Sequence, residues 1–506
     1  MFVVKARKTD STASILEETR KRKSYTTHLR LDTVAIQDVE LNVGCRDGII
    51  PVLRALQHVY SDSTLTDRIL GLIGADINEN SRTDTGRKGM DYWHICVLAA
   101  TRLGCDYTYD QLQDLSDNHR DLRAIMGLGS LDEAEFHHKT LRNTFCLLRP
   151  STIEQISQAI VAEGHKLCPG AIEIVRADSF VMETNIHYPP ESRLLYDGLR
   201  NIISACVRLA EERAVSGWRQ HIPLLSKVKK INRQINRIAS KKGPNYKTRM
   251  KPLYRELLQK TALLTQRARD LCLAVGQPAP TQADLFGANT LQAFIIRTEC
   301  VARTARQRVI EDKTVPNCDK LFSISEPHTQ LYQRGKAGHP VQFGRQVLVF
   351  EDAAGFLVRG VLMGRNEGDQ EVAVRETKLL QEIFDRKVKR LSFDRGFHSP
   401  ENQTNLSQLV PHLCLPKSGA KQSVVQQAEA DDEFLAAQKN HSGGESAIGA
   451  LQSGNALKRC RDRSEMGFER YRQWGILGRN LHTLGRLLIA KENDDAAAGR
   501  SRRKAA

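Results

Sequence analysis

The sequence predicts an α/β protein, in which helices flank a mixed sheet and a helical insertion separates the first strand from the others. Residues 173–184 (EIVRADSFVMET) are rich in β-branched and apolar residues and show no helical stripe, which indicates a strand. Strand patterns return only after residue 320. They comprise a hairpin over 347–363 and short strands over 389–393 and 409–416, with an amphipathic helix over 371–384 after the hairpin.

Helical patterns fill most of the remaining chain. Residues 85–166 form short helical segments ahead of the first strand, and Ser130 and Glu133 have the spacing of a capping box. The insertion is interrupted at Gly243-Pro244, which predicts two antiparallel helices joined by a basic turn. Residues 468–491 form a last helix with an apolar face, followed by a basic tail that we expect to be disordered. The predicted segments are residues 1–84, 85–166, 167–194, 195–315, 316–491 and 492–506.

The charge of the chain favours a polyanionic partner. Its formal net charge is +16 and its isoelectric point is about 9.4. Basic residues are concentrated over 219–255 with almost no acids between them, so the run would repel itself unless it met phosphates. The alternative is a solvated helical face. We predict DNA-backbone contacts for Lys227, Lys229, Lys230, Arg233, Arg237, Lys241 and Lys242.

Other features of the sequence argue against zinc-binding, secreted, membrane-spanning, nucleotide-hydrolysing and sugar-cleaving proteins. The eleven cysteines are scattered and form no Cys-x-x-Cys pair, which argues against a structural zinc site and is typical of a reducing compartment. No signal peptide and no apolar run long enough to cross a membrane is found, so we expect a cytoplasmic protein. The Gly-rich loop over 334–340 lacks the spacing of a P-loop. The basic charge and an aromatic content of 6% suit a glycosidase poorly.

Three acids lie where a rigid scaffold could hold metal ions. Asp178 interrupts an apolar strand, Asp394 directly follows a strand, and Glu445 follows two glycines where a helix should start. Carboxylates are the ligands that Mg²⁺ prefers, and two such ions can promote phosphodiester cleavage. Each acid could instead be an ordinary turn or capping residue. Other acids that could replace them are Glu183, Asp197, Glu351, Asp352 and Glu465.

Four segments of the chain resemble the catalytic core of bacterial insertion-sequence transposases of the DDE class. They are residues 178–200, 326–369, 391–403 (LSFDRGFHSPENQ) and 445–485, and residues 85–130 resemble the helical N-terminal domain of the same enzymes. The resemblance implies an RNase H-like fold with Asp178, Asp394 and Glu445 as the catalytic, metal-binding residues. The sequence departs from the pattern of some members of this family before Glu445, where His441, Ser442 and Gly443 stand in place of a Tyr and an Arg.

The resemblance also implies an activity. Such an enzyme uses Mg²⁺, or Mn²⁺ in its place, to cut DNA at the terminal inverted repeats of an element and to join the strands to target DNA. It usually acts as a homodimer or a larger assembly. Arg395, Lys458 and Arg459 are candidates for orienting a phosphate. Two alternatives stay open: a catalytically inactive DNA-binding derivative, and a nuclease on the same fold that does not transfer strands.

Overall fold

The chain forms two compact units. The computed structural model describes residues 32–79, 89–275, 281–333, 341–417, 434, 437, 441 and 443–505, without the side chains of 284, 443–446 and 499–505. Unit 1 comprises Met1–Met182 and Gln346–Ala506, and unit 2 comprises Glu183–Arg345. Unit 2 is therefore inserted in the sequence of unit 1, and the predicted insertion, residues 195–315, lies within it.

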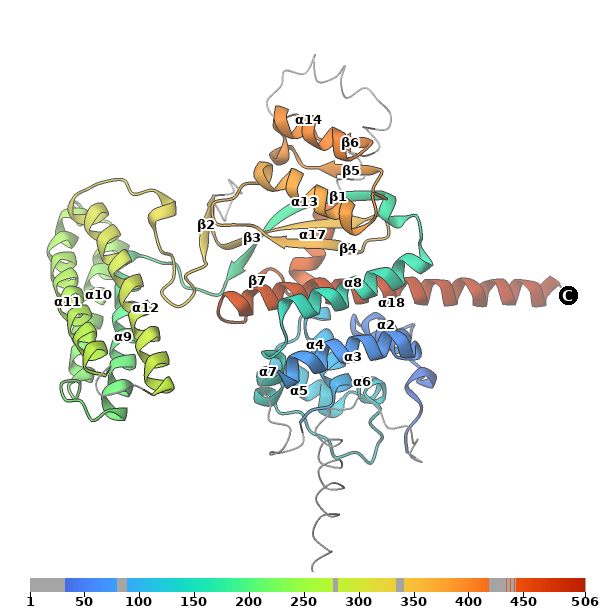
Figure 1. Ribbon diagram of the computed structural model, residues 1–506, viewed down its shortest axis with the longest axis horizontal. Coiled ribbons are helices and arrows are strands. Elements are labelled where there is room, and N and C mark those ends of the chain that lie inside the picture. The colour runs from blue at the N-terminus through green and yellow to red at the C-terminus, as the bar shows by residue number, and fades with distance from the viewer. Residues whose placement is uncertain are drawn as a thin grey trace, which may run out of the picture. The chain divides into compact units, whose positions relative to one another are not determined.

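A mixed, open sheet of seven strands confirms the predicted α/β class (Figure 1). The strand order is β2-β3-β1-β5-β6, with β4 paired to β3 and β7 paired to β1. β5 runs parallel to β1 and to β6, whereas β3 pairs antiparallel with β2 and β4. The strands are β1 (Ile174–Thr184), β2 (Gln330–Gln333), β3 (Val341–Asp352), β4 (Leu357–Leu362), β5 (Arg390–Phe393), β6 (His412–Cys414) and β7 (Arg459–Cys460).

The predicted hairpin is formed by β3 and β4, and Asp352 shapes its turn. The Asp352 carboxylate accepts hydrogen bonds from the backbone N–H groups of Ala354 (3.0 Å) and Phe356 (2.9 Å). Gly355 has φ +87°, a conformation that glycine adopts without steric cost. Asp352 and Gly355 thus supply the turn chemistry that the sequence between the two strands predicts.

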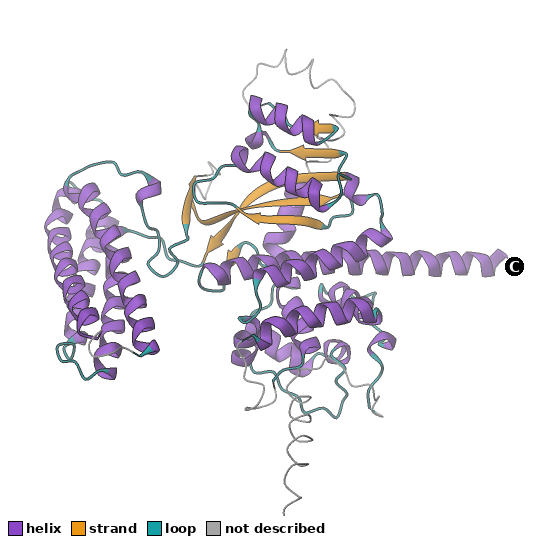
Figure 2. Cartoon of the chain, in the orientation of Figure 1, coloured by secondary structure: helices purple, strands orange, loops and turns teal. Residues whose placement is uncertain are grey.

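The helices of unit 1 surround the sheet and form a helical region ahead of it (Figure 2). Their bounds are α2 (Ile49–Ser61), α3 (Ser63–Asn78), α4 (Tyr92–Gly104), α5 (Tyr109–Asn118), α6 (Arg120–Ile125), α7 (His138–Phe145), α8 (Pro150–Leu167), α13 (Asp369–Ile383), α14 (Pro400–Leu409), α17 (Gly443–Gly454) and α18 (Glu465–Ala505). Short 3₁₀ turns are η1 (Ile36–Asp38), η2 (Ala171–Glu173) and η5 (Arg395–Phe397).

The capping box that we expected at Ser130 is absent. No helix begins there, because Asp132 closes a turn by accepting a hydrogen bond from the Gly129 N–H at 2.8 Å. A capping box is instead formed by Thr108 and Gln111 at the start of α5. The spacing alone therefore located the motif at the wrong helix start.

α18 joins the N-terminal helices to the sheet, since it packs against α2, α4, α8 and β4. A Cβ at Gly478 would lie 2.7 Å from the Gly104 Cα of α4, so the two helix backbones touch. At the sheet, the Asn480 amide binds both the N–H and the C=O of Leu357 and donates to the Ser157 hydroxyl of α8. These contacts involve residues far apart in sequence and fix α18 between two layers of unit 1.

The tail that we expected to be disordered, residues 492–506, continues α18 as far as Ala505. Residues 491–498 are exposed, and Glu492 pairs with Arg54 of α2 at 2.5 Å. Residues 496–498 are alanines, and alanine has the highest intrinsic helix propensity of any residue type. This propensity accounts for the continuation of α18 into the tail.

Unit 2 is built around four long helices with one shared apolar core (Figure 2). They are α9 (Glu191–Glu212), α10 (His221–Lys241), α11 (Tyr246–Val275) and α12 (Gln282–Ala305), followed by a π-helical turn, η3 (Arg306–Ile310), and a 3₁₀ turn, η4 (Asn317–Asp319). The predicted break at Gly243-Pro244 falls in the turn between α10 and α11. In that turn, Lys242 and Asn245 have φ values of 41° and 54°.

Candidate functional site

Asp178 lies on β1, and Asp394 directly follows the parallel neighbouring strand β5. The register of β1 and β5 pairs Ala177 with Phe393, so the two aspartates are the next residues on the adjacent strands. Neighbouring strands lie about 4.8 Å apart. The structure therefore brings together two of the three acids that the sequence singled out.

The two carboxylates also share one face of the sheet. Side chains alternate along a strand, so Asp178 lies on the same face as Arg176, and Asp394 on the same face as Ser392, the register partner of Arg176. Ala177 and Phe393 point to the opposite face and are fully buried. We call the face with Asp178 and Asp394 the aspartate face.

Two helices cover opposite faces of the sheet. Arg359 of β4 binds Glu376 of α13 at 2.6 Å and is the register partner of Phe350. Glu351, the next residue of β3, points to the other face and pairs with Arg176 at 2.5 Å. α13 thus covers the face away from the aspartates, whereas Arg479 of α18 approaches Glu351 on the aspartate face.

Local backbone contacts orient both aspartates. The Asp178 carboxylate accepts a hydrogen bond from the Ser179 N–H at 2.6 Å. Asp394 caps η5 and accepts from the Arg395 N–H at 2.7 Å. Asp394 and Arg395 are exposed and Asp178 is half-buried, so solvent reaches this edge of the sheet.

Glu445 lies in the first turn of α17, as expected for an acid after two glycines, but its side chain is outside the described residues. The structure does describe His441, which lies two residues before this helix. The His441 Nδ1 lies 3.2 Å from the Ser392 hydroxyl, and Ser392 is two residues before Asp394 on the aspartate face. The chain thus passes over the aspartate face just before it enters α17.

The adjacent aspartates fit the ligand chemistry of a hard divalent cation, which takes carboxylate oxygens. Among the described side chains, no group of three or more His, Cys, Asp and Glu residues could hold a metal ion. That finding does not include Glu445, so it leaves the predicted set of three open. Asp178 and Asp394 are the described residues that could contribute to such a centre.

The other acids that the sequence offered have different surroundings. Glu351 is buried between Arg176 and Arg479, and burial raises the pKa of its carboxyl even though both arginines oppose that shift. Asp352 binds His165 at 2.7 Å in addition to its turn amides. Asp197 pairs with arginines of its own helix. These partners indicate structural roles. Glu183 is the last residue but one of β1 and belongs to unit 2, and Glu465 begins α18.

The predicted DNA-binding residues of unit 2 are on and directly after α10. All seven are exposed, and none forms an ion pair with a described carboxylate. Lys229, Arg233, Arg237 and Lys241 follow one another at intervals of four residues, so they form a line along one side of the helix, which we call the basic stripe. The opposite side buries Val228, Ile231 and Ile235 in the bundle core.

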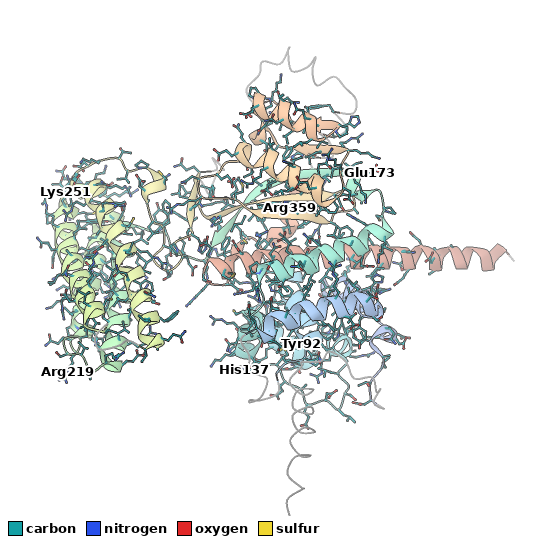
Figure 3. The ribbon with its side chains drawn as sticks, viewed as in Figure 1. Tyr92, His137, Glu173, Arg219, Lys251 and Arg359 are labelled. Carbon is teal, nitrogen blue, oxygen red and sulfur yellow. The ribbon has the colours of Figure 1, made fainter. Side chains whose placement is uncertain are left out.

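The basic stripe covers the part of α10 from Lys229 to its last residue, Lys241. Figure 3 labels Arg219 and Lys251, which lie at opposite ends of unit 2, where α10 and α11 begin. Lys251 is paired with Asp312 at 2.5 Å, in contrast to the residues of the stripe. The stripe therefore has the unpaired charge that phosphate binding requires.

Sequence reasoning missed a cluster of charges on the aspartate face. Arg176 of β1 and Arg479 of α18 share the carboxylate of Glu351, and Arg486 lies close enough to lower the pKa of Arg479 further after the effect of burial. The one available signal was Arg176 itself, a charged residue two positions before Asp178 in a buried strand.

No family model, curated protein or solved structure matches the chain. Within the described parts of the chain, every helix is too short or too polar to cross a membrane.

Proposed function

We propose that the protein is a DDE transposase with an RNase H-like core. One observation carries the proposal: Asp178 and Asp394 directly follow Ala177 and Phe393, which are register partners on the parallel strands β1 and β5. The order β4-β3-β1-β5-β6, with an antiparallel hairpin on one side of β1 and parallel strands on the other, supports an RNase H-like sheet. The resemblance of the sequence around both aspartates points the same way.

In this proposal, Asp178, Asp394 and Glu445 hold Mg²⁺ or Mn²⁺. When bound, the ions supply activation of a water or 3′ hydroxyl and charge relief at the leaving oxygen. Arg395, exposed beside Asp394, binds a phosphate of the DNA next to the cut. The cations of α10 hold the DNA backbone without reading its sequence. The reaction is hydrolysis at the ends of the element, followed by attack of the freed 3′ hydroxyl on target DNA.

Incubation of the protein with the DNA that flanks its own gene and Mg²⁺ tests the proposal. We expect nicks at the repeat ends and joined products with a target plasmid. Asp178→Asn and Asp394→Asn should abolish both while DNA binding persists, because an amide removes the charge of a metal ligand with little change of volume. Asp385→Asn is the matched control, since Asp385 is an exposed aspartate in a turn of unit 1.

The outcomes separate the alternatives. Nicks without joined products would identify a nuclease that does not transfer strands. DNA binding without any nick would identify an inactive derivative. Cleavage near the wild-type rate in both aspartate variants would refute the assignment of Asp178 and Asp394.

A further inference from the structure

The ladder of hydrogen bonds between β1 and β5 ends one residue before the two aspartates, at the pair of Ala177 and Phe393. Asp394 lies beyond the end of β5, where it caps the turn η5 and is exposed. Pairing of these two strands therefore does not by itself fix the distance between Asp178 and Asp394. Side chains on the face that α13 covers supply a further constraint.

Buried Gln346 of β3 joins the strand of Asp178 to the first residue of α13. Ser179 directly follows Asp178, so its side chain points to the face that α13 covers, and its backbone N–H binds the Asp178 carboxylate. The Gln346 amide group donates to the Ser179 hydroxyl at 2.8 Å and to the Asp369 carboxylate at 2.7 Å. Asp369 is the first residue of α13, so Gln346 holds β1 against the start of that helix.

The start of α13 also contacts η5, the turn that Asp394 caps. The Gln370 side chain donates to the His398 carbonyl at 2.8 Å, directly after η5. A Cβ at Gly396 would lie 3.5 Å from the Asp369 carboxylate, which is an ordinary van der Waals distance. The first two residues of α13 therefore touch the turn that carries Asp394.

Asn402 of α14 reinforces the contact between α13 and η5. Its buried amide group donates to the carbonyls of Gln370 at 2.8 Å and Phe397 at 2.9 Å. A continuous path of contacts thus leads from β1 through Gln346 and the start of α13 to η5. Because Gln346 and the start of α13 lie behind the aspartates, they can fix the distance between the carboxylates without touching a metal ion or DNA.

We propose that Gln346 is a positioning residue, which sets the distance between the Asp178 and Asp394 carboxylates through the start of α13. The inference rests on the proposed function, because it assumes that both aspartates bind the same metal ions. Such a site requires its ligands to be held within about 0.5 Å of the productive geometry. Loss of a residue that orients metal ligands from behind typically weakens metal binding about 10- to 100-fold.

Metal binding in the absence of DNA tests the inference separately from cleavage. Mn²⁺ is titrated calorimetrically into the wild-type protein, Gln346→Met and Asp178→Asn. Methionine has a similar length to glutamine but no hydrogen-bond donor, so Gln346→Met removes both hydrogen bonds of the amide group. Its affinity for Mn²⁺ should fall about 10- to 100-fold. Asp178→Asn, which removes a ligand, marks the loss expected when the site itself is broken.

Gln381→Met is the matched control. Gln381 is also a buried glutamine, and its amide group donates to the carbonyls of Val388 at 2.9 Å and Leu409 at 2.8 Å. It lies in the last turn of α13, at the opposite end of the helix from Asp369. Both variants should lower the midpoint of urea unfolding, because each leaves buried polar partners unpaired. Only Gln346→Met should weaken Mn²⁺ binding, which separates positioning from a loss of stability.

Hydrogen exchange of the metal-free protein measures the path itself. In Gln346→Met, backbone amides should exchange faster both over 178–182 of β1 and over 394–402, which contains η5. In Gln381→Met, exchange in both segments should match the wild type. Ser179→Ala removes the first hydrogen bond of the path from its other partner, and it replaces Gln346→Met if that variant does not fold.

Three results would overturn the inference: wild-type Mn²⁺ affinity in Gln346→Met, an equal loss of affinity in Gln381→Met, or unchanged exchange over 394–402 in Gln346→Met. A different pattern would count against the proposed function alone. If the wild-type protein does not bind Mn²⁺ but Gln346→Met accelerates exchange in both segments, then Gln346 positions the aspartates as inferred and the metal-dependent reaction is refuted.

Discussion

The basic stripe of α10 should contribute a large share of the salt dependence of DNA binding. We consider the combined substitution by Gln of three stripe residues, Lys229, Arg233 and Arg237, and of the adjacent Lys230. All four side chains are exposed and none pairs with a described acid, so each is available for one phosphate. With about 0.9 per contact, loss of four contacts lowers the slope of log affinity against log salt by roughly 3.6. When the salt concentration rises from 50 to 200 mM, the loss of DNA affinity should therefore be about 150-fold smaller for the variant than for the wild type.

Fluorescence anisotropy titrations with an arbitrary duplex at three salt concentrations measure the slope. The matched control is Lys260→Gln with Arg269→Gln, because these cations of α11 already pair with Glu256 and Glu299. The control should leave the slope nearly unchanged. The thermal stability of the combined variant should not decrease, because like charges four residues apart repel each other by about 0.2–0.5 kcal/mol per pair.

An unchanged slope in the combined variant would show that the stripe is only a solvated helical face. A lost preference for the element's ends with an unchanged slope would show instead that α10 reads bases. In that case the proposal that the cations of α10 hold the DNA backbone without reading its sequence would be wrong.

Three further predictions concern unit 1. Glu351→Ala should destabilise the protein by about 2–3 kcal/mol in urea unfolding, because it leaves its two arginine partners without their shared acid in a largely buried site; an unchanged midpoint would contradict this. Burial and two neighbouring arginines lower the pKa of His482 from 6.5 to about 4. The folded state therefore holds the neutral imidazole more strongly than the unfolded state does, and the free energy of unfolding should decrease as the pH falls from about 6.5 to 4. His482→Phe should flatten the dependence of the urea midpoint on pH in this window, and an identical pH profile would disprove the effect. Gly478→Ala should cost about 1–3 kcal/mol because its Cβ would meet the backbone of Gly104, whereas Gly71→Ala, with open space around its Cβ, should be neutral or stabilising.

Local patterns were sufficient to predict β1, β3, β4, β5 and β6, whereas β2 and β7 were not predicted. β-branched residues over 173–184 and the short run before Asp394 matched β1 and β5 closely, because strand periodicity is encoded in neighbouring residues. The resemblance then named Asp178 and Asp394, which the register places side by side.

Features that depend on distant residues could not be predicted in the same way. The sharing of Glu351 by Arg176 and Arg479 joins three segments whose proximity is decided only by the packing of α18. The contact of Gly478 with Gly104 likewise depends on how two helices cross. The expected capping box at Ser130 was wrong because no helix begins there: Asp132 instead closes a turn by accepting a hydrogen bond from the Gly129 N–H.

The division of the chain into units has a consequence for its synthesis. Domains generally fold as they emerge from the ribosome, at about 5–20 residues per second. Unit 2 is one continuous segment and can fold while translation proceeds. Unit 1 cannot be completed until α18 is made, because this last helix packs against α2, α4 and α8 from the beginning of the chain. Nascent chains must therefore hold the apolar faces of these earlier helices unburied until α18 has been translated, and products that stop before α18 should be recognised by chaperones and proteases.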